Sequence, residues 1–440
     1  MTVVFGAEVD RRIVNVRFDD KVVLQVSPHA MTPIGSEEVV EARGAALLPG
    51  LHDHHIHLLA TARARTSIDV ANGVDALAAA PSQSGWLRAI GGSDELDAAT
   101  LDRVVPHRPV RVQHHSGAMW VLNSTGLAAV GAHEASEQGI ERFPDGTPTG
   151  RLWRLDDWLG ARVDDEPPDL GRLGHELTSF GITGVTDATP TIGPGAVEIF
   201  AAARLPQRLH FLADRPPPFG VAGPRKIVVE DHDLPTYDAL REEVADARVL
   251  GRAVAVHCVT REAVLLILAV LDEVGVVLGD RIEHAAIADS DVVARLARLG
   301  IAVVTQPGFI LERGDRYLRD VPPADLPDLY RYASLMNARV ATVPSSDAPY
   351  GPIDPWTVMR SARDRRSASR TPVNPKEWVS ASVVLSGYLR PPGALHAAPR
   401  RVRAGEPADL VLLRLPLAEA LDDPRAELVA RTWHAAPTGS

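Results

Sequence analysis

Cysteine, lysine and long apolar runs are all scarce in this sequence of 440 residues. Cys258 is the only cysteine, so no disulfide can form within the chain, and a single thiol is typical of a reducing compartment. No apolar run approaches the roughly 18 residues that a membrane span requires. The first residues also lack the basic region and apolar run of a signal peptide. We therefore expect a cytoplasmic protein without a membrane partner.

Positive charge is limited and scattered. The chain has 46 basic and 57 acidic residues, a formal net charge of −11, and no basic stripe that could follow a phosphate backbone. This distribution argues against a nucleic-acid partner. The only lysines are Lys21, Lys226 and Lys376, and every other basic residue is arginine. A lysine inside an apolar segment of this chain therefore needs a chemical explanation.

Short apolar segments alternate with segments of helical period along most of the chain. Val and Ile on both faces of a strand indicate a parallel sheet that helices cover on each side. Eight such strands predict the α/β class and a closed (β/α)8 barrel, the TIM barrel. The predicted strands lie in 44–57, 181–189, 208–214, 226–231, 253–258, 280–285, 301–307 and 339–347.

The remaining segments predict two additions to the barrel at 49–395. Residues 58–175 are too long for one crossover and include a strand-like run at 108–115, which indicates an insertion after the first strand. Both chain ends alternate apolar and polar residues, as half-buried strands do. We expect residues 1–48 and 396–440 to form a small composite β-sandwich domain.

The motif LHDHHIHL at 51–58 contains four histidines within six residues. Side chains two apart in a strand share a face, so Asp53, His55 and His57 point to one side. Active-site groups of a barrel gather at the carboxyl ends of its strands, which favours His55 and His57 as metal ligands. The alternative for an isolated motif of this kind is a polar strand end with solvated histidines.

Three further residues follow later strands. His257 and His284 each end an apolar strand, and Asp347 comes just after another. Taken singly, each histidine could be a core residue whose hydrogen bonds are made within the protein, and Asp347 could be a turn residue before Ala-Pro. Together with His55 and His57 they would surround one barrel mouth, an arrangement that predicts a divalent metal.

Lys226 begins the apolar strand KIVVED. Burying an unpaired ammonium group costs several kcal/mol, so a lysine there is expected to have a lowered pKa. Its neutral amine could add CO2 and form a carbamate, whose two oxygens could bridge two metal ions. The alternative is a lysine at a strand end whose ammonium group reaches solvent.

Several segments resemble one known family. PGLHDHHIHL, KIVVED, VAVHC, RIEHA and SSDAPYGPIDPW, in this order, resemble the metal-binding strands of the amidohydrolase superfamily. The segments SGWLRAIG, VLNSTGL and DGTPTGRL are similar to the branch that contains N-substituted formamide deformylases. The resemblance implies one or two divalent ions, with zinc favoured. It assigns His55, His57 and Asp347 to one ion, His257 and His284 to a second, and carboxylated Lys226 to the bridge between them.

The resemblance also implies a chemistry, in which metal-activated water cleaves an amide or formamide-type C–N bond and Asp347 shuttles the proton. The alternatives on this scaffold are a deaminase or lactonase with one metal ion, or a non-catalytic homologue. Ala118 and the pair Thr260-Arg261 depart from the branch pattern, as does Glu230-Asp231, so the substrate is left open. The partner we expect is a small-molecule substrate, and a homodimer stays open. By position, the candidates for lining the substrate pocket are Trp86, His115, Trp120 and Asn123.

Overall fold

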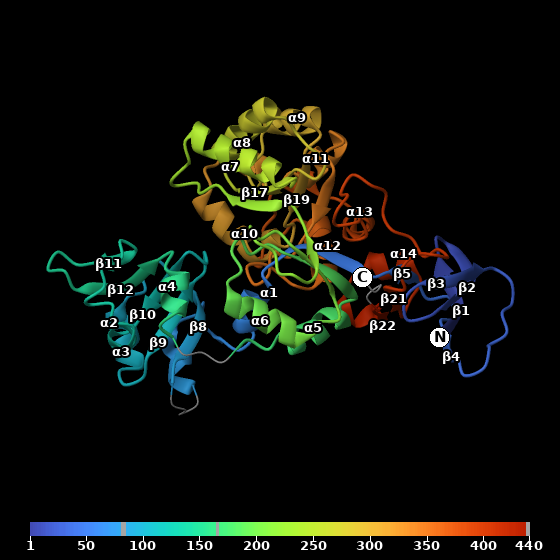
Figure 1. Ribbon diagram of the computed structural model, residues 1–440, viewed down its shortest axis with the longest axis horizontal. Coiled ribbons are helices and arrows are strands. Elements are labelled where there is room, and N and C mark those ends of the chain that lie inside the picture. The colour runs from blue at the N-terminus through green and yellow to red at the C-terminus, as the bar shows by residue number, and fades with distance from the viewer. Residues whose placement is uncertain (81–84, 164–166, 437–440) are drawn as a thin grey trace. The chain divides into compact units, whose positions relative to one another are not determined.

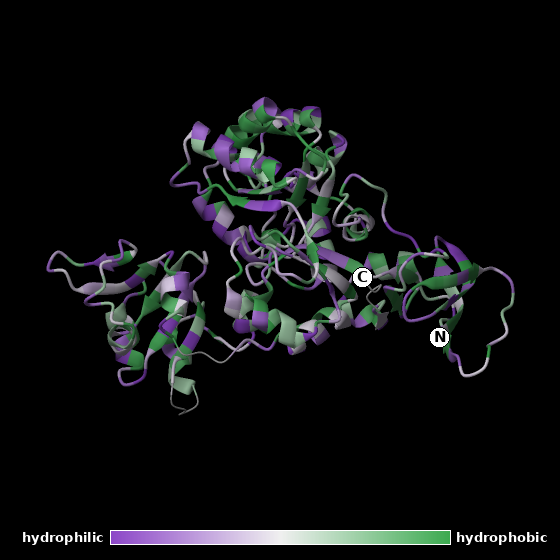
Figure 2. Cartoon of the chain, viewed as in Figure 1, coloured by the Kyte–Doolittle hydropathy of each residue, from purple (hydrophilic) through white to green (hydrophobic). Residues whose placement is uncertain are grey.

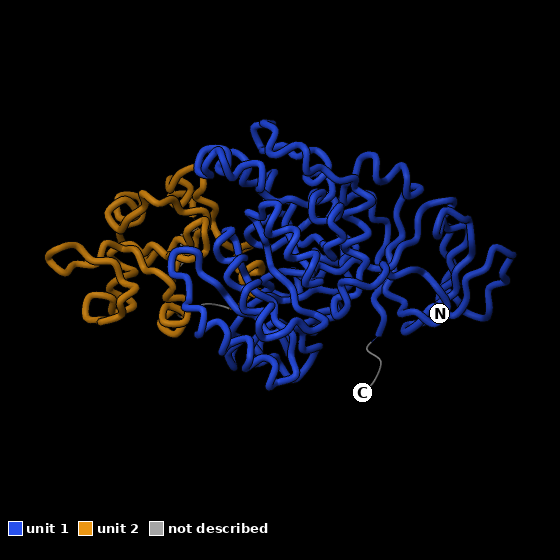
Figure 3. The backbone as a smooth tube through the Cα atoms, turned by 90° about the horizontal axis from the view of Figure 1, so that it is seen from above, with its two compact units in different colours: residues 1–58, 170–440 blue, residues 59–169 orange. Residues whose placement is uncertain are grey.

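The computed structural model describes residues 1–80, 85–163 and 167–436. The chain forms two compact units: one combines Met1–Leu58 with Leu170–Ser440, and the other is Leu59–Asp169 (Figure 3). The second unit lies within the range predicted for the insertion. Residues 81–84 and 164–166 of that insertion, and 437–440 of the predicted β domain, lie outside the described residues. None of the described helices is long and apolar enough to cross a membrane.

Every predicted strand of the barrel overlaps an observed strand, and neighbouring strands within each of two sheets pair in parallel. The α/β class is thereby confirmed. The strands are β6 (Leu51–Ile56), β13 (Ile182–Asp187), β14 (Arg208–Phe211), β16 (Arg225–Val228), β17 (Val254–Cys258), β18 (Arg281–His284), β19 (Ala302–Thr305) and β20 (Thr342–Pro344).

The described strands form two parallel sheets rather than the closed barrel that the sequence predicts. One sheet has the order β15-β14-β13-β6 and the other the order β16-β17-β18-β19-β20. A short extra strand, β15 (Val221–Ala222), occupies the edge of β14 that would face β16, and Pro344 in β20 has no N–H to donate. Isolated backbone hydrogen bonds nevertheless connect the sheets at both junctions. Lys226 N donates to Leu212 O at 2.7 Å, and Asp347 N donates to His55 O at 2.8 Å.

Helices cover the second sheet because each presents an apolar stripe to it (Figures 1 and 2). Thr260 caps α8, and α9 ends at Gly300, whose φ of 67° glycine adopts readily. The buried cluster beneath these helices includes Ile227, Val256 and Ile282. The helices of this unit are α5 (Leu170–Ser179), α6 (Pro194–Ala203), α7 (Tyr237–Val249), α8 (Arg261–Val274), α9 (Ser290–Leu299), α10 (Phe309–Asp320), α11 (Tyr332–Asn337), α12 (Pro355–Asp364), α13 (Ala381–Tyr388) and α14 (Leu417–Asp422).

The two chain ends pair with each other. Near the N-terminus, β1 (Thr2–Val9), β2 (Arg12–Phe18), β3 (Val23–Ser27) and β4 (Glu38–Glu41) form one sheet. A second sheet joins β5 (Leu47–Pro49) to β21 (Leu410–Leu413) and β22 (Val429–Trp433). Residues of both sheets, such as Val16 and Leu412, share one buried cluster. The pairing agrees with the sequence analysis, while a separate β-sandwich domain remains a prediction.

Residues 59–169 contain a six-stranded sheet of their own, where the sequence analysis expected one strand. Its strands are too short for their period to stand out from the turns between them. The order is β11 (Ile140–Arg142), β12 (Pro148–Trp153), β10 (Met119–Leu122), β9 (Val110–His114), β8 (Leu87–Gly92) and β7 (Ile68–Asp69). The accompanying helices are α2 (Ala98–Val104), α3 (Ser124–Ala129) and α4 (Asp156–Gly160), and α1 (Leu58–Ala64) leads into the unit.

Candidate metal centre

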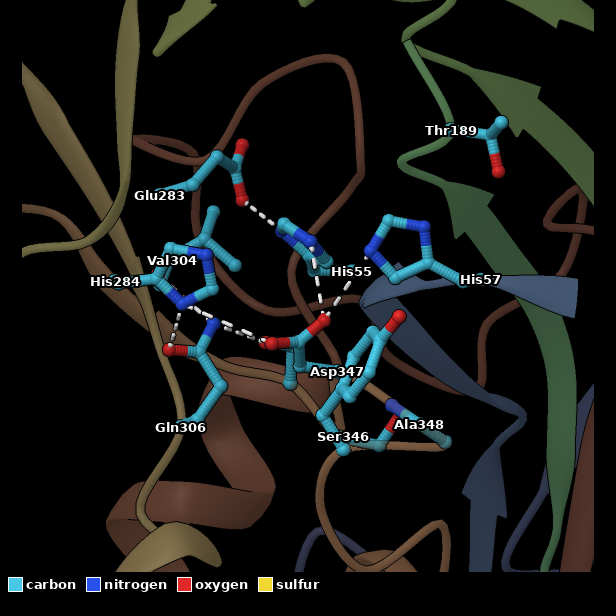
Figure 4. A network of polar contacts seen from close by, with 12 residues as sticks. His55, His57, Thr189, Glu283, His284, Val304, Gln306, Ser346, Asp347 and Ala348 are labelled. Carbon is cyan, nitrogen blue, oxygen red and sulfur yellow. Dashed lines mark hydrogen bonds and ion pairs between the residues drawn. The ribbon is translucent and has the colours of Figure 1, made fainter. Parts of the chain in front are cut away.

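Three of the predicted ligands, all histidines, surround the carboxylate of a fourth, Asp347 (Figure 4). Nε2 of His55 and Nε2 of His57 each lie 3.4 Å from Asp347 Oδ1, and Nδ1 of His284 lies 3.9 Å from Asp347 Oδ2. His55, His284 and Asp347 are buried, and they offer ligand atoms that all lie within 4.8 Å of one another. The ends of β6, β18 and β20 thus supply one site.

A buried carboxylate orients His55. Nδ1 of His55 lies 2.5 Å from Glu283 Oε2, and the other carboxylate oxygen of Glu283 accepts from Arg281 Nε at 2.6 Å. Because the carboxylate of Glu283 accepts from Arg281 and can likewise accept from His55, we assign His55 Nδ1 as the donor in this contact. Nε2 of His55 then carries the lone pair. A carboxylate behind a histidine is the usual support of a metal-binding imidazole.

The imidazole of His284 is oriented in a similar way. Its Nδ1 lies 2.8 Å from Gln306 Oε1, which can only accept, so the lone pair is again on Nε2. The backbone of His284 has a φ of 74° and that of Asp347 a φ of 51°, both in the left-handed region. Residues other than glycine rarely adopt this region, and such strain is concentrated at functional sites.

This arrangement fits a divalent cation. The lone pair of His55 Nε2 faces the negative Asp347 Oδ1 at 3.4 Å, which is unfavourable unless a positive charge lies close to both. Asp347 Oδ1 and His284 Nε2 are buried, and neither has a hydrogen-bond partner among the described residues. Burial lowers the pKa of His55 and His284, so proton uptake by these imidazoles does not readily supply that charge. Neutral imidazole and carboxylate are ligands suited to zinc.

His257 and Lys226 border this cluster. The ring of His257 lies 4.4 Å from that of His284, centroid to centroid, and Lys226 is buried with 7% of its surface exposed. Burial lowers the pKa of Lys226, while the carboxylates of Glu283 and Asp347 act in the opposite direction. The electrostatic influence of Lys226 reaches His55, His257 and His284. Lys226 is therefore close enough to interact electrostatically with the cluster, and its role as a carbamate bridge remains a prediction.

Three supporting residues were not identified from the sequence: Arg281, Glu283 and Gln306. Arg281 and Glu283 are two apart in β18 and share its inward face, so their charges in an apolar strand were a usable signal. Gln306 follows β19 without a comparable motif. Its contact with His284 depends on how neighbouring strands are staggered, which the sequence alone does not reveal.

The four predicted substrate-pocket residues all lie in the separate unit of residues 59–169. The side-chain amide of Asn123 forms four hydrogen bonds to the backbone of its own unit. Its Oδ1 accepts from Val110 N and Gly126 N, and its Nδ2 donates to Val105 O and Arg108 O.

Two of the others also have structural contacts. Trp120 is buried and donates from Nε1 to Asp156 Oδ1 at 2.8 Å, and Trp86 packs against the same core cluster. These contacts give Asn123 and Trp120 structural roles within their unit, and their predicted contact with substrate remains a prediction. His115 Nδ1 contacts the carbonyl oxygen of Gly92. A contact of His115 with substrate remains a prediction.

Three further histidines are held neutral inside the first unit. His52 Nε2 contacts Thr186 Oγ1 at 2.8 Å, and His54 Nε2 donates to Gly387 O at 3.0 Å. His210 lies beside His52, with ring centroids 5.3 Å apart. Burial lowers the pKa of all three, to about 3 for His54 and about 4 for His210.

The free energy of unfolding is therefore expected to fall as the pH drops below 6.5. The unfolded imidazoles, with pKa values near 6.5, bind protons that the folded ones exclude until the pH nears their depressed values. Between pH 6.5 and its depressed pKa, each histidine lowers the free energy of unfolding by up to about 1.4 kcal/mol for every pH unit. Urea unfolding at pH 7, 6 and 5 measures the slope of the free energy of unfolding against pH. His210→Asn should make it shallower and the exposed control His29→Asn should not, whereas an unchanged slope in His210→Asn would contradict this account.

Comparison with known proteins extends over nearly the whole chain. The model of the amidohydrolase family matches residues 38–435. An N-substituted formamide deformylase from Arthrobacter pascens is 26% identical over 90% of this chain and 88% of its own length. The putative amidohydrolase YtcJ from Bacillus subtilis is 23% identical over 75% of each chain. Among solved structures, an uncharacterized metal-dependent hydrolase from Pyrococcus horikoshii superimposes with a TM-score of 0.74 at 16% identity, covering 98% of this chain and 97% of that one.

Proposed function

The chain belongs to the amidohydrolase family, and we propose on that basis that it is a metal-dependent hydrolase that cleaves an amide or formamide-type C–N bond. The name of the Arthrobacter pascens relative, N-substituted formamide deformylase, supports a formamide-type substrate. The observation that carries the proposal is the close approach of His55 Nε2 to Asp347 Oδ1, which calls for a cation.

The proposed ligands form two neighbouring sets. His55, His57 and Asp347 would hold the first ion, His257 and His284 would hold a second, and Lys226 would lie between them. When bound, a zinc-like ion supplies Lewis acidity, which lowers the pKa of water toward about 7 and polarises a carbonyl group.

Asp347 performs the proton transfer in this proposal. Burial alone would raise its pKa, but the imidazoles of His55, His57 and His284 lower it well below its usual range. The carboxylate is therefore ionised at neutral pH and accepts the proton of the attacking water. It then returns the proton to the leaving nitrogen, which departs as a neutral amine.

Lys226 is proposed to act as a carbamate. Its buried amine loses a proton more readily than an exposed lysine, and the neutral nitrogen can add to CO2. The new N–C bond gives a carbamate with the release of one proton. The carbamate carries a negative charge in place of the ammonium, which suits a site with two divalent ions.

Removal of the metal tests the proposed function directly. Dialysis against a zinc chelator is expected to abolish hydrolysis, and returning zinc, manganese or cobalt to the same protein should restore it. The substrates to assay are N-substituted formamides, N-acyl amino acids, hydantoins and lactones, with release of amine or acid as the readout. We expect turnover among the substrates that contain a C–N bond.

Other outcomes of this experiment would support different functions. Hydrolysis confined to lactones would indicate a lactonase. With cyclic amidines added to the panel, release of ammonia from them would indicate a deaminase. Metal-free protein that is as active as the reloaded protein would reject metal-dependent catalysis. Protein that binds metal but turns over no substrate class would favour a non-catalytic homologue.

A further inference from the structure

A second group of metal-binding side chains lies within residues 59–169, where two parallel strands end. β8 ends at Gly92 and Asp94 follows it, whereas His114 is the last residue of β9 and His115 comes next. Asp94, His114 and His115 offer ligand atoms that all lie within 4.8 Å of one another. None of these residues belongs to the site around Asp347.

The position of His115 determines which of its nitrogens can bind a cation. Its Nδ1 lies 2.9 Å from the carbonyl oxygen of Gly92, which also accepts from His115 N at 3.1 Å. A carbonyl oxygen can only accept, so Nδ1 carries the proton and the lone pair is on Nε2. Metal-binding histidines commonly donate from their second nitrogen to a backbone carbonyl in this way.

His114 connects the other two members of the group. Its Nε2 lies 3.0 Å from Asp94 Oδ1, and its Nδ1 lies 2.7 Å from Ser116 Oγ. Ser116 N also donates to this Nδ1 at 3.2 Å, so Nδ1 is an acceptor in the structure and Nε2 carries the proton that faces Asp94. The rings of His114 and His115 are 3.7 Å apart, centroid to centroid.

We propose that Asp94, His114 and His115 form a second metal site, which takes a zinc ion. Two imidazole nitrogens and one carboxylate oxygen are a ligand set that zinc accepts, with water in the fourth position. For the ion to bind His114 Nε2, the proton of this ring moves from Nε2 to Nδ1, where Ser116 Oγ accepts it and the contact from Ser116 N is given up. The Asp94 side chain is 75% exposed, which provides a path for the ion from solvent. Binding ties the loop after β8 to the end of β9.

Zinc binding to the full chain tests this proposal. Equilibrium dialysis with zinc alone is expected to show one more equivalent in the wild type than in the double variant Asp94→Asn/His115→Gln. The exposed His133 serves as the control, and His133→Gln should keep the wild-type stoichiometry. The variant His55→Ala/His57→Ala should keep the zinc of the second site, so that loss at one site is distinguished from loss at the other.

Single substitutions keep the test decisive if the double variant does not fold. Because Asp94 is largely exposed, Asp94→Asn should fold normally, and it is expected to weaken the affinity for this zinc by about tenfold or more. Cobalt(II) provides a second readout, since its visible absorption reports imidazole ligands. Wild-type stoichiometry and affinity in Asp94→Asn and in the folded double variant would overturn the proposal.

Discussion

Asp347→Asn is expected to lower kcat by about 10²–10⁴-fold while the protein stays folded. Asparagine has nearly the same shape as aspartate, but its amide cannot accept the proton of the attacking water. Asp347 is the only acidic residue of the three-ligand group, and its Oδ1 is buried without a hydrogen-bond partner among the residues described. Steady-state kinetics on the substrate found in the metal-dependent assay measure the loss.

Asp354 offers a matched control for this substitution. Its carboxylate caps α12 by accepting from Trp356 N and Thr357 N. Asparagine caps helices about as well, so Asp354→Asn should retain normal turnover. Metal content and circular dichroism of both variants separate loss of chemistry from loss of structure. Near-normal kcat in Asp347→Asn would identify another base, and Glu230, at the end of the lysine strand, would be the first to examine.

Lys226→Arg is expected to lose most activity and the second metal equivalent. Guanidinium stays protonated and cannot add CO2, although arginine preserves the positive charge and much of the length. The expected loss of activity is about 10²-fold or more, the upper range seen when support for a metal ligand is removed. Lys226→Ala should behave similarly, and added short carboxylates with bicarbonate should restore part of its activity, because they can replace the bridging oxygens.

The exposed Lys376 provides the control for this series, since Lys376→Arg should change neither activity nor metal content. Mass spectrometry offers an independent readout if the carbamate survives at neutral pH. Full activity with unchanged metal content in Lys226→Arg would contradict the bridge. The enzyme would then use a single ion held by His55, His284 and Asp347, and the deaminase interpretation would become the stronger one.

Much of the fold could be predicted because buried parallel strands are apolar on both faces. The segments around β17 and β19 stand out as Val-rich runs, and α8 and α9 show a clear helical period. The interruption between the two sheets could not be predicted. It depends on the two-residue strand β15 and on which edge that strand occupies. The sequence of a strand does not show which other strand it pairs with.

Some residues of the candidate site could likewise be predicted from the sequence, and the roles of others could not. His55, His257 and Asp347 could be proposed from the sequence because chemistry at strand ends produces polar residues directly after apolar runs. Asn123 also follows such a run, yet in the structure it holds four backbone groups together. A polar residue that supports a turn and one that meets a substrate have the same sequence pattern.

Burial period and strand ends are local properties, so the α/β class and the eight strands along the chain could be predicted from the sequence, and candidate metal ligands could be proposed from it. Tertiary structure alone decided which nitrogen of each histidine carries the lone pair. That choice depends on Glu283 for His55 and on Gln306 for His284. In each case the partner is brought within hydrogen-bond distance from another strand, and contacts of this kind depend on the packing of distant segments rather than on neighbours in the chain.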